Sequence, residues 1–176
     1  AELMRNFDFV AIQEADAGSL RTQFTNQIEY LAQRAGFAHW GMAVTRNLRP
    51  VARHALGFLS RHAPVRVEEH VLPSRIPGRR AMHITLGADL GGLELFVTHL
   101  SLARDSRQRQ LHYLNQLLPA LGPAALLGHL NCATPDLGQQ LGGAHSRLCG
   151  QDHSLDPYPS WRPTCQVDHL RAKRGD

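Results

Sequence analysis

The chain has 176 residues, and 43% of them are hydrophobic, so it is long and apolar enough for one compact domain with a real core, which argues against wholesale disorder. The formal net charge is +4, the sequence pI is about 9.4, and Lys173 is the only lysine, so arginine carries nearly all of the positive charge. Arginine forks match the geometry of phosphate, which is compatible with an anionic substrate, although an arginine-rich solvated surface gives the same balance.

Cysteine use and hydropathy indicate a cytoplasmic protein. Cys132, Cys149 and Cys165 are odd in number and form no Cys-x-x-Cys pair, which argues against a disulfide scaffold and for a reducing compartment. No apolar run approaches transmembrane length, and residues 1–5 do not resemble a signal peptide. We therefore expect a cytoplasmic monomer without a membrane span.

The first half of the chain predicts a strand, a helix and a group of short strands. The strand runs from Phe7 to Ile12 and ends in Gln13-Glu14. Ser19 is a good N-cap for the helix, and Gly36 is a C-cap. The apolar positions at helical spacing are Leu20, Phe24, Ile28 and Leu31. The strands that follow are expected at Met42 to Thr45, Ala55 to Leu59 and Val65 to Val71.

The second half predicts a hairpin, a second helix and two more strands. The hairpin strands are Ala81 to Leu86 and Leu93 to Thr98, joined by a turn with a double glycine. The remaining elements are a helix from Arg104 to Leu118, strands at Ala124 to Leu130 and Val167 to Leu170, and a loop-rich stretch from Thr134 to Pro163 with a short helix near Asp136 to Leu141. Because no repeat or linker interrupts this order, it favours a single layered α/β domain over residues 1–176.

Four polar motifs stand at or just beyond the ends of apolar strand-like runs. They are Ile12-Gln13-Glu14, Thr98-His99-Leu100-Ser101, Leu127-Gly128-His129-Leu130-Asn131 and Val167-Asp168-His169. Glu14 suits a hard cation such as Mg²⁺, which takes oxygen ligands and usually only one or two carboxylates. His99 could donate a proton to a phosphoryl oxygen, and Asn131 could position water or phosphate. Asp168 could orient an imidazole. Each motif alone has an ordinary structural explanation, but their joint order predicts a phosphoesterase site at strand ends.

These motifs, in this order, resemble the endonuclease/exonuclease/phosphatase superfamily, which has the deoxyribonuclease-I-like fold, and in particular its bacterial cytoplasmic members. Further similar segments are Gly57-Phe58-Leu59-Ser60-Arg61, Leu72-Pro73 through Arg79-Arg80-Ala81, Arg109-Gln110-Leu111 and Tyr158 to Pro163. The resemblance implies a hydrolase of phosphate esters that depends on Mg²⁺, with Mn²⁺ as the alternative. It also implies that Glu14 binds the metal and that His99 acts on the phosphate. Nucleic acids, phospholipids and small phosphodiesters all remain open as substrates.

The sequence departs from the family pattern in three places. His129 stands where the family's Gly-Asp-x-Asn motif has the aspartate that orients and deprotonates the attacking water. The family also has an Asn-bearing strand before the Gln-Glu strand and a closing Ser-Asp-His strand, and neither falls within residues 1–176. We therefore expect a layered β-sandwich flanked by helices, without these edge strands, and an impaired phosphoesterase.

Two alternatives stay open. One is a non-catalytic relic that keeps the fold and an anion-binding cleft, because a histidine at position 129 changes the local charge. The other is a transition-metal site, because His and Cys are ligands that suit Zn²⁺. The His/Cys pairs are His129 with Cys132, Cys149 with His153, and Cys165 with His169, although their spacings match no zinc motif.

Overall fold

The computed structural model describes residues 1–119, 122–131, 146–149 and 168–173, the last two ranges as backbone only. The strands are β1 (Phe9–Asp16), β2 (His39–Leu48), β3 (Ala52–Ser60), β4 (Pro64–Val71), β5 (Arg80–Leu86), β6 (Glu94–His99), β7 (Ala124–His129), β8 (Ser146–Cys149) and β9 (Asp168–Lys173). The helices are α1 (Gln27–Ala35) and α2 (Arg104–Leu117), and short 3-10 helices lie at Leu3–Asn6, Leu20–Thr22 and Ala88–Leu90.

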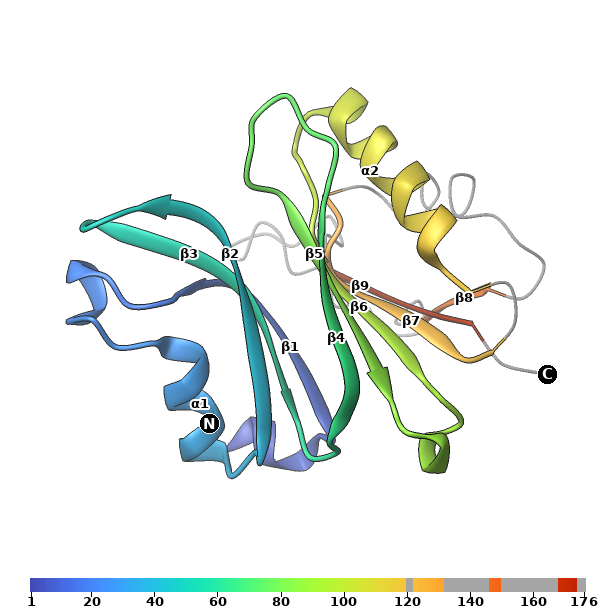
Figure 1. Cartoon of the computed structure of the whole chain (residues 1–176), viewed down its shortest axis with the longest axis horizontal. Coiled ribbons are helices and arrows are strands. Elements are labelled where there is room, and N and C mark those ends of the chain that lie inside the picture. Colours follow the sequence, from blue (N-terminus) through green and yellow to red (C-terminus); the bar gives the residue numbers. More distant parts are fainter. Residues whose placement is uncertain (120–121, 132–145, 150–167, 174–176) are drawn as a thin grey trace, which may run out of the picture.

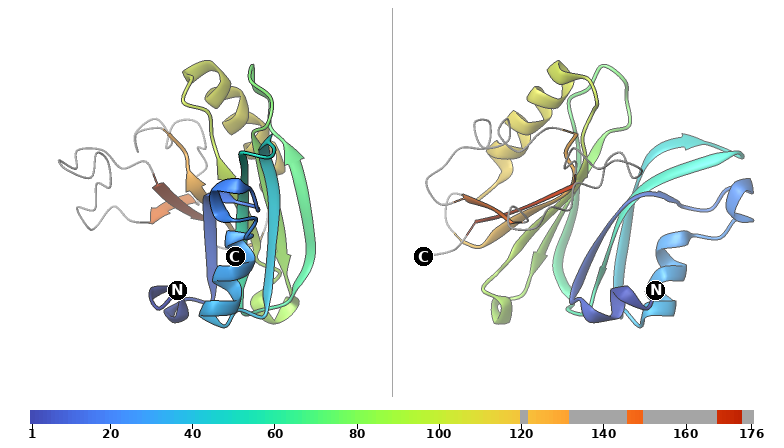
Figure 2. Two further views of the ribbon diagram at one scale, coloured as in Figure 1. Left: turned by 90° about the vertical axis from the view of Figure 1, so that its left-hand side faces the viewer. Right: turned by 180° about the vertical axis from the view of Figure 1, so that it is seen from behind.

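The strands form two sheets, and a helix covers the outer face of each sheet (Figure 1). The first sheet has the order β1-β3-β2 and is antiparallel. The second has the order β4-β5-β6-β7-β9-β8, in which only the β6–β7 pair is parallel. The view from behind in Figure 2 shows α1 against the first sheet and α2 against the second. The expectation of a layered α/β sandwich is confirmed.

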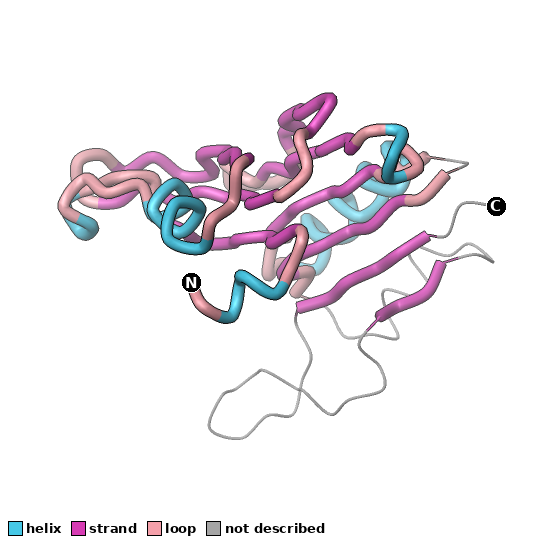
Figure 3. Tube along the Cα trace, turned by 90° about the horizontal axis from the view of Figure 1, so that it is seen from below, coloured by secondary structure: helices cyan, strands magenta, loops and turns pink. Residues whose placement is uncertain are grey.

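Alternation along the strands builds three apolar layers, because successive side chains of a strand point to opposite faces. In β3, Leu56 and Phe58 pack between the two sheets, while Ala55 and Leu59 pack under α1. In β6, Val97 faces the space between the sheets, whereas its neighbour Phe96 faces α2. Figure 3 shows the same elements from below, with cyan helices flanking the magenta strands. Both sheets are therefore buried on both faces near the centre of the molecule.

The first helix begins later than the sequence predicts. Ser19 caps the short 3-10 helix Leu20–Thr22, and α1 starts after Asn26, whose Oδ1 accepts from Ile28 N at 3.1 Å. Leu20 and Phe24 are 54% and 66% exposed, so they do not belong to the buried stripe of a helix. The predicted end is right, because Gly36 closes α1 at a φ of +76°.

The other boundaries differ mainly in length. The three strands expected between Met42 and Val71 are all present but longer, as β2, β3 and β4. The strand β8 was not predicted, since it falls within the stretch expected to be loop. The short helix expected near Asp136 to Leu141 lies outside the described residues.

Candidate active site

The two central strands of the second sheet bring His99 and His129 together. Both residues are the last of their strands, and the parallel register of β6 and β7 pairs them directly. Their rings stack with centroids 5.0 Å apart and an angle of 5° between the planes. Alternation places both on the face that β6 and β7 turn towards the first sheet. The chain leaves β6, forms α2 and returns as the parallel strand β7. This connection aligns two histidines that are far apart in sequence.

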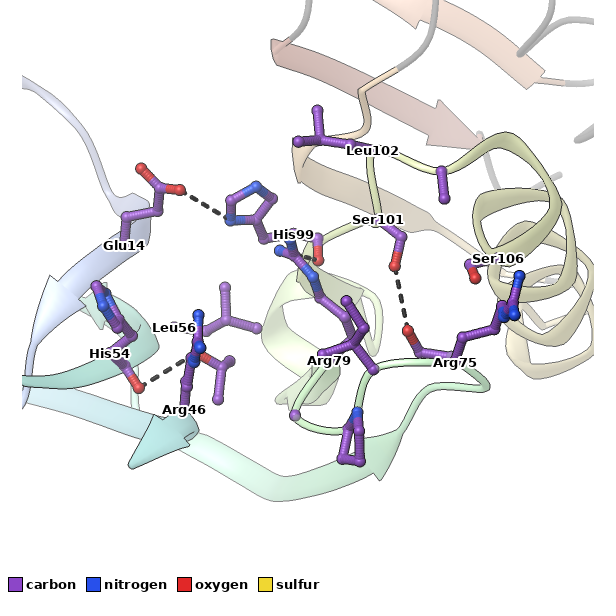
Figure 4. Close-up of a pocket in the computed structure, with 16 residues that line it drawn as sticks. Glu14, Arg46, His54, Leu56, Arg75, Arg79, His99, Ser101, Leu102 and Ser106 are labelled. Atoms are coloured by element: carbon purple, nitrogen blue, oxygen red, sulfur yellow. Dashed lines mark hydrogen bonds and ion pairs between the residues drawn. The ribbon is translucent and has the colours of Figure 1, made fainter. Parts of the chain in front are cut away.

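Glu14 reaches this histidine pair from the first sheet. The sequence predicts that the strand ends at Ile12, but β1 continues to Asp16, and its pairing with β3 shifts between Ile12 and Ala15. Glu14 sits in this bulge at a φ of +57°, and bulges next to active sites re-aim a side chain. Its side chain is 71% exposed, and its Oε1 lies 3.7 Å from His99 Nδ1 (Figure 4). The bulge therefore points the carboxylate across the gap between the sheets.

Asn131 lies just beyond β7 and ties the two strand ends together. It has a φ of +55°, and its Nδ2 donates to Leu100 O at 2.8 Å. In return, Leu100 N donates to His129 O at 3.0 Å. The amide is thus held by the segment that follows His99, which leaves its Oδ1 as an available oxygen donor to a ligand.

Asp168 is the first residue of β9, and its backbone pairs with His129. Its side chain lies outside what the structure describes, as do the side chains of all three cysteines, so none of the three His/Cys pairs falls wholly within the described side chains. The structure brings Glu14, His99 and His129 into one group, with Asn131 bound to the adjoining loop. The backbone of Asp168 stands beside that group.

Gly128 allows β7 to lie close against β6 near their ends. It has a φ of +135°, which residues other than glycine rarely adopt. A Cβ at this position would also collide with the carbonyl oxygen of Thr98 on the neighbouring strand. The glycine of the Gly-His-x-Asn motif is therefore required by the backbone itself.

A cleft of about 790 Å³ opens beside Glu14 and His99. One wall comes from the segment between β4 and β5, where Gly78 packs on Thr45 so closely that a Cβ would meet its carbonyl oxygen. The charged and titratable side chains that line the cleft are those of Glu14, Arg46, His54, Arg75, Arg79 and His99 (Figure 4). Among the described residues that line the cleft, three are arginines and one is a carboxylate, so the lining carries a net positive charge suited to an anion.

Arg79, like Arg46, His54 and Arg75, lines this cleft but was not predicted from the sequence as a site residue. Its Nη1 donates to the carbonyl oxygen of His99 at 3.1 Å. Burial lowers the pKa of Arg79, and the carboxylate of Glu14 opposes that shift; an arginine nevertheless stays charged at neutral pH. The signal available in the sequence was its place after Pro77-Gly78, directly before a strand that pairs with the His99 strand.

The segment after His99 is braced from α2. Gln110 is fully buried, and its Oε1 accepts from Ser101 N at 2.9 Å while its Nε2 donates to Ser101 Oγ at 3.0 Å. Arg107 Nη1 donates to Leu102 O at 2.6 Å. These bonds fix one rim of the cleft, so the position of His99 does not depend on a free loop.

The donor set fits a hard cation only in part. Mg²⁺ is usually held by one or two carboxylates and keeps several waters. The site offers the smaller of these numbers, one exposed carboxylate from Glu14, together with the amide oxygen of Asn131. His129 offers nitrogen, which suits transition metals better. Within the described part of the cleft, no second carboxylate compensates for it.

The chain matches the model of the endonuclease/exonuclease/phosphatase family over residues 1–170. A similar solved structure is that of the family member from Beutenbergia cavernae, with a TM-score of 0.70 and 18% identity over 97% of this chain and 57% of that chain. Another is the family member from Leptotrichia buccalis, with a TM-score of 0.72 and 12% identity over 99% of this chain and 79% of that chain. D. rerio TDP2, in complex with a single-strand DNA product, has a TM-score of 0.66 and 16% identity over 99% of this chain and 74% of that chain.

These identities are low, so the structural matches establish the fold alone, and the chain spans little more than half of the Beutenbergia protein. No curated protein matches the chain in sequence. In the part of the chain that the structure describes, no helix has the length and apolar character needed to cross a membrane. The resemblance found in the sequence is confirmed by the family match over nearly the whole chain: this protein belongs to the endonuclease/exonuclease/phosphatase family.

Proposed function

We propose that the domain binds a phosphate ester in its basic cleft and hydrolyses it with the help of a divalent cation held at Glu14. The observation that carries the proposal is the contact of Glu14 with His99 beside a cleft lined by three arginines. Family membership supports a hydrolase of the phosphoesterase or nuclease type. Mg²⁺, or Mn²⁺ in its place, is the proposed cofactor.

In this mechanism, the guanidinium groups of Arg46, Arg75 and Arg79 bind the phosphate oxygens. Glu14 holds the cation, and the amide oxygen of Asn131 binds it or positions a water. The cation, when bound, acts as a Lewis acid and neutralises charge on the phosphoryl group. His99 donates a hydrogen bond to a phosphoryl oxygen. Asp168, next to the backbone of His129, is proposed to orient an imidazole.

We further propose that turnover is slow, because His129 stacks on His99 at the position where the family pattern has its water-orienting aspartate. The loss of one general base commonly costs about 10²- to 10⁴-fold in rate. The same observation favours the second candidate function, an anion-binding domain without catalysis. A cytoplasmic location, a monomeric state and a single domain over residues 1–176 also stay predictions.

The test is hydrolysis of bis-p-nitrophenyl phosphate with Mg²⁺ and with Mn²⁺. We expect slow turnover that chelator abolishes and that Glu14→Gln lowers at least tenfold, whereas Glu2→Gln, an exposed residue that does not line the cleft, leaves it unchanged. Phosphate binding without any metal-dependent turnover would favour the anion-binding domain. Turnover that resists both chelator and Glu14→Gln would contradict the proposed mechanism.

A further inference from the structure

A second group of metal-binding side chains lies on β4 and β5, and none of them lines the cleft. Glu68, His70 and His83 each offer one ligand atom, and these atoms lie within 4.8 Å of one another. The register pairs Glu68 directly with His83, and His70 follows two positions after Glu68 on the same face of β4. That face is the one covered by α2, because His83 stacks on Phe96 and His70 contacts Tyr113. His99 and His129 face the other way, so the two groups lie on opposite faces of the second sheet.

His83 is held as a metal-binding histidine usually is. Its Nε2 lies 3.0 Å from Glu94 Oε2, and its ring stacks on Phe96 with centroids 4.2 Å apart. Its other nitrogen, Nδ1, lies 3.7 Å from Glu68 Oε2. A carboxylate on one ring nitrogen fixes the tautomer and leaves the other nitrogen free to ligate, which is the common arrangement behind zinc-binding histidines.

The other two residues also present an available ligand atom. Glu68 accepts from Arg66 Nη2 through Oε1 at 2.7 Å, which leaves Oε2 directed at His83. The Nε2 atom of His70 is buried and has no hydrogen-bond partner among the described residues. Buried polar atoms are nearly always paired, so an unpaired nitrogen beside two ligand atoms calls for a partner that the described part of the chain does not supply.

We propose that Glu68, His70 and His83 form a site for Zn²⁺ or a similar transition-metal ion, separate from the cleft. The ligands are Glu68 Oε2, His70 Nε2 and His83 Nδ1, with Glu94 orienting His83. Two imidazoles and one carboxylate leave a fourth position for water. Bonds of about 2.0–2.1 Å in a tetrahedron bring ligand atoms about 3.4 Å apart, so side-chain rotations close the present separations of up to 4.8 Å. The ion would clamp the edge strand β4 onto β5.

The test is calorimetric titration of the chelator-treated full chain with Zn²⁺, together with thermal unfolding. Zinc binding at the His/Cys pairs of the sequence is the competing explanation, so the affinity of wild type is compared with that of variants of this cluster. We expect one Zn²⁺ site whose affinity falls at least tenfold in His70→Gln and in Glu68→Gln, and about 10- to 100-fold in Glu94→Gln. Zn²⁺ should raise the melting temperature of wild type but not of Glu68→Gln.

Two matched controls separate this site from other sources of binding. His112→Gln removes an exposed histidine of α2 and should leave Zn²⁺ affinity unchanged. Glu2→Gln removes an exposed carboxylate that belongs neither to the cleft nor to this cluster, and it should also leave Zn²⁺ affinity unchanged. Wild-type affinity in Glu68→Gln and Glu94→Gln, both at partly exposed positions, would overturn the proposal even if His70→Gln failed to fold.

Discussion

His129 sets the charge at the end of β7. It contributes a nitrogen where an oxygen ligand would favour Mg²⁺, and its ring is occupied by the stack with His99. Its backbone pairs with His99 of β6 on one side and with Asp168 of β9 on the other, so the side chain at this position does not set the register of the strand ends. The chemistry of this position can therefore be changed without changing the path of the chain.

The first prediction is that His129→Asp raises Mg²⁺ affinity about tenfold, because a second carboxylate would then face the cation site proposed at Glu14. A tenfold change corresponds to about 1.4 kcal/mol, well below the roughly 4 kcal/mol expected for unit charges at 4 Å near a protein surface. Isothermal titration with MgCl₂ gives the affinity. His129→Asn is the matched control, since it has the same shape without the charge. Equal affinities of the Asp and Asn variants would show that residue 129 does not face the cation.

Candidate site residues could be chosen from the sequence only where the predicted end of a strand marked them. Glu14, His99 and Asn131 could be chosen because each follows an apolar run and because the order of the motifs is specific. Arg79 could not, because its place depends on how β5 pairs with β6 and on the close packing of Gly78 against Thr45. The cluster on β4 and β5 was missed for the same reason: Glu68 and His83 become neighbours only through strand register.

At the scale of elements, the turn between β1 and α1 is organised by a buried carboxylate. Asp16 Oδ2 accepts from Ser19 Oγ at 2.6 Å, and Oδ1 accepts from Gly18 N at 3.0 Å. Ser19, the predicted N-cap, instead donates to this carboxylate, and the hydroxyl of Thr22 does so as well. The N-cap signal of Ser19 and the apolar spacing after it therefore placed the helix start too early.

The second prediction concerns the pH dependence of stability. Burial raises the pKa of the Asp16 carboxyl, but hydrogen bonds outweigh that effect and leave the pKa lowered from 3.8. The donors are the side chain of Ser19, the backbone amides of Arg53 and Gly18, and the side chain of Thr22. Because the folded-state pKa is depressed, this contribution to stability is present above the unfolded-state value and is lost as the pH falls through the folded-state pKa.

Asp16→Asn should therefore lower the free energy of unfolding at pH 7 by about 1–3 kcal/mol, the cost of leaving buried hydrogen-bonding groups unpaired. The difference from wild type should shrink as the pH falls below 3.8. Urea unfolding at several pH values measures it, with Asp8→Asn as a control at an exposed aspartate. A difference that stays constant between pH 7 and pH 3 would mean that the charge of Asp16 does not stabilise the turn.

At the scale of the whole molecule, the cleft joins the two sheets. Glu14 and Arg46 come from the first sheet, and His99 comes from the second, while Arg79 immediately precedes β5. The layered arrangement was predictable because the spacing of apolar residues differs between strands and helices and shows which face of each element is buried. The cleft itself was not, because it depends on the bulge in β1 and on the approach of the 73–79 segment to β2, neither of which has a periodic signature.

The third prediction follows from this shared construction. A ligand that binds only the folded cleft stabilises the whole molecule, by about 1.4 kcal/mol when its concentration is about ten times its Kd. Inorganic phosphate should therefore raise the free energy of unfolding in a concentration-dependent way, and added NaCl should weaken the effect by screening the arginines.

Arg79→Met should abolish most of the stabilisation by phosphate, because this guanidinium is half-buried at the cleft and fixed on the carbonyl of His99. Arg34→Met is the matched control, since Arg34 lies over the ring of Tyr30 on α1 and does not line the cleft. Urea unfolding at fixed ionic strength, with and without phosphate, measures the shift in each protein. If phosphate stabilised both variants as strongly as wild type, the anion would be binding elsewhere, and the positive charge of the cleft would have no part in recognising it.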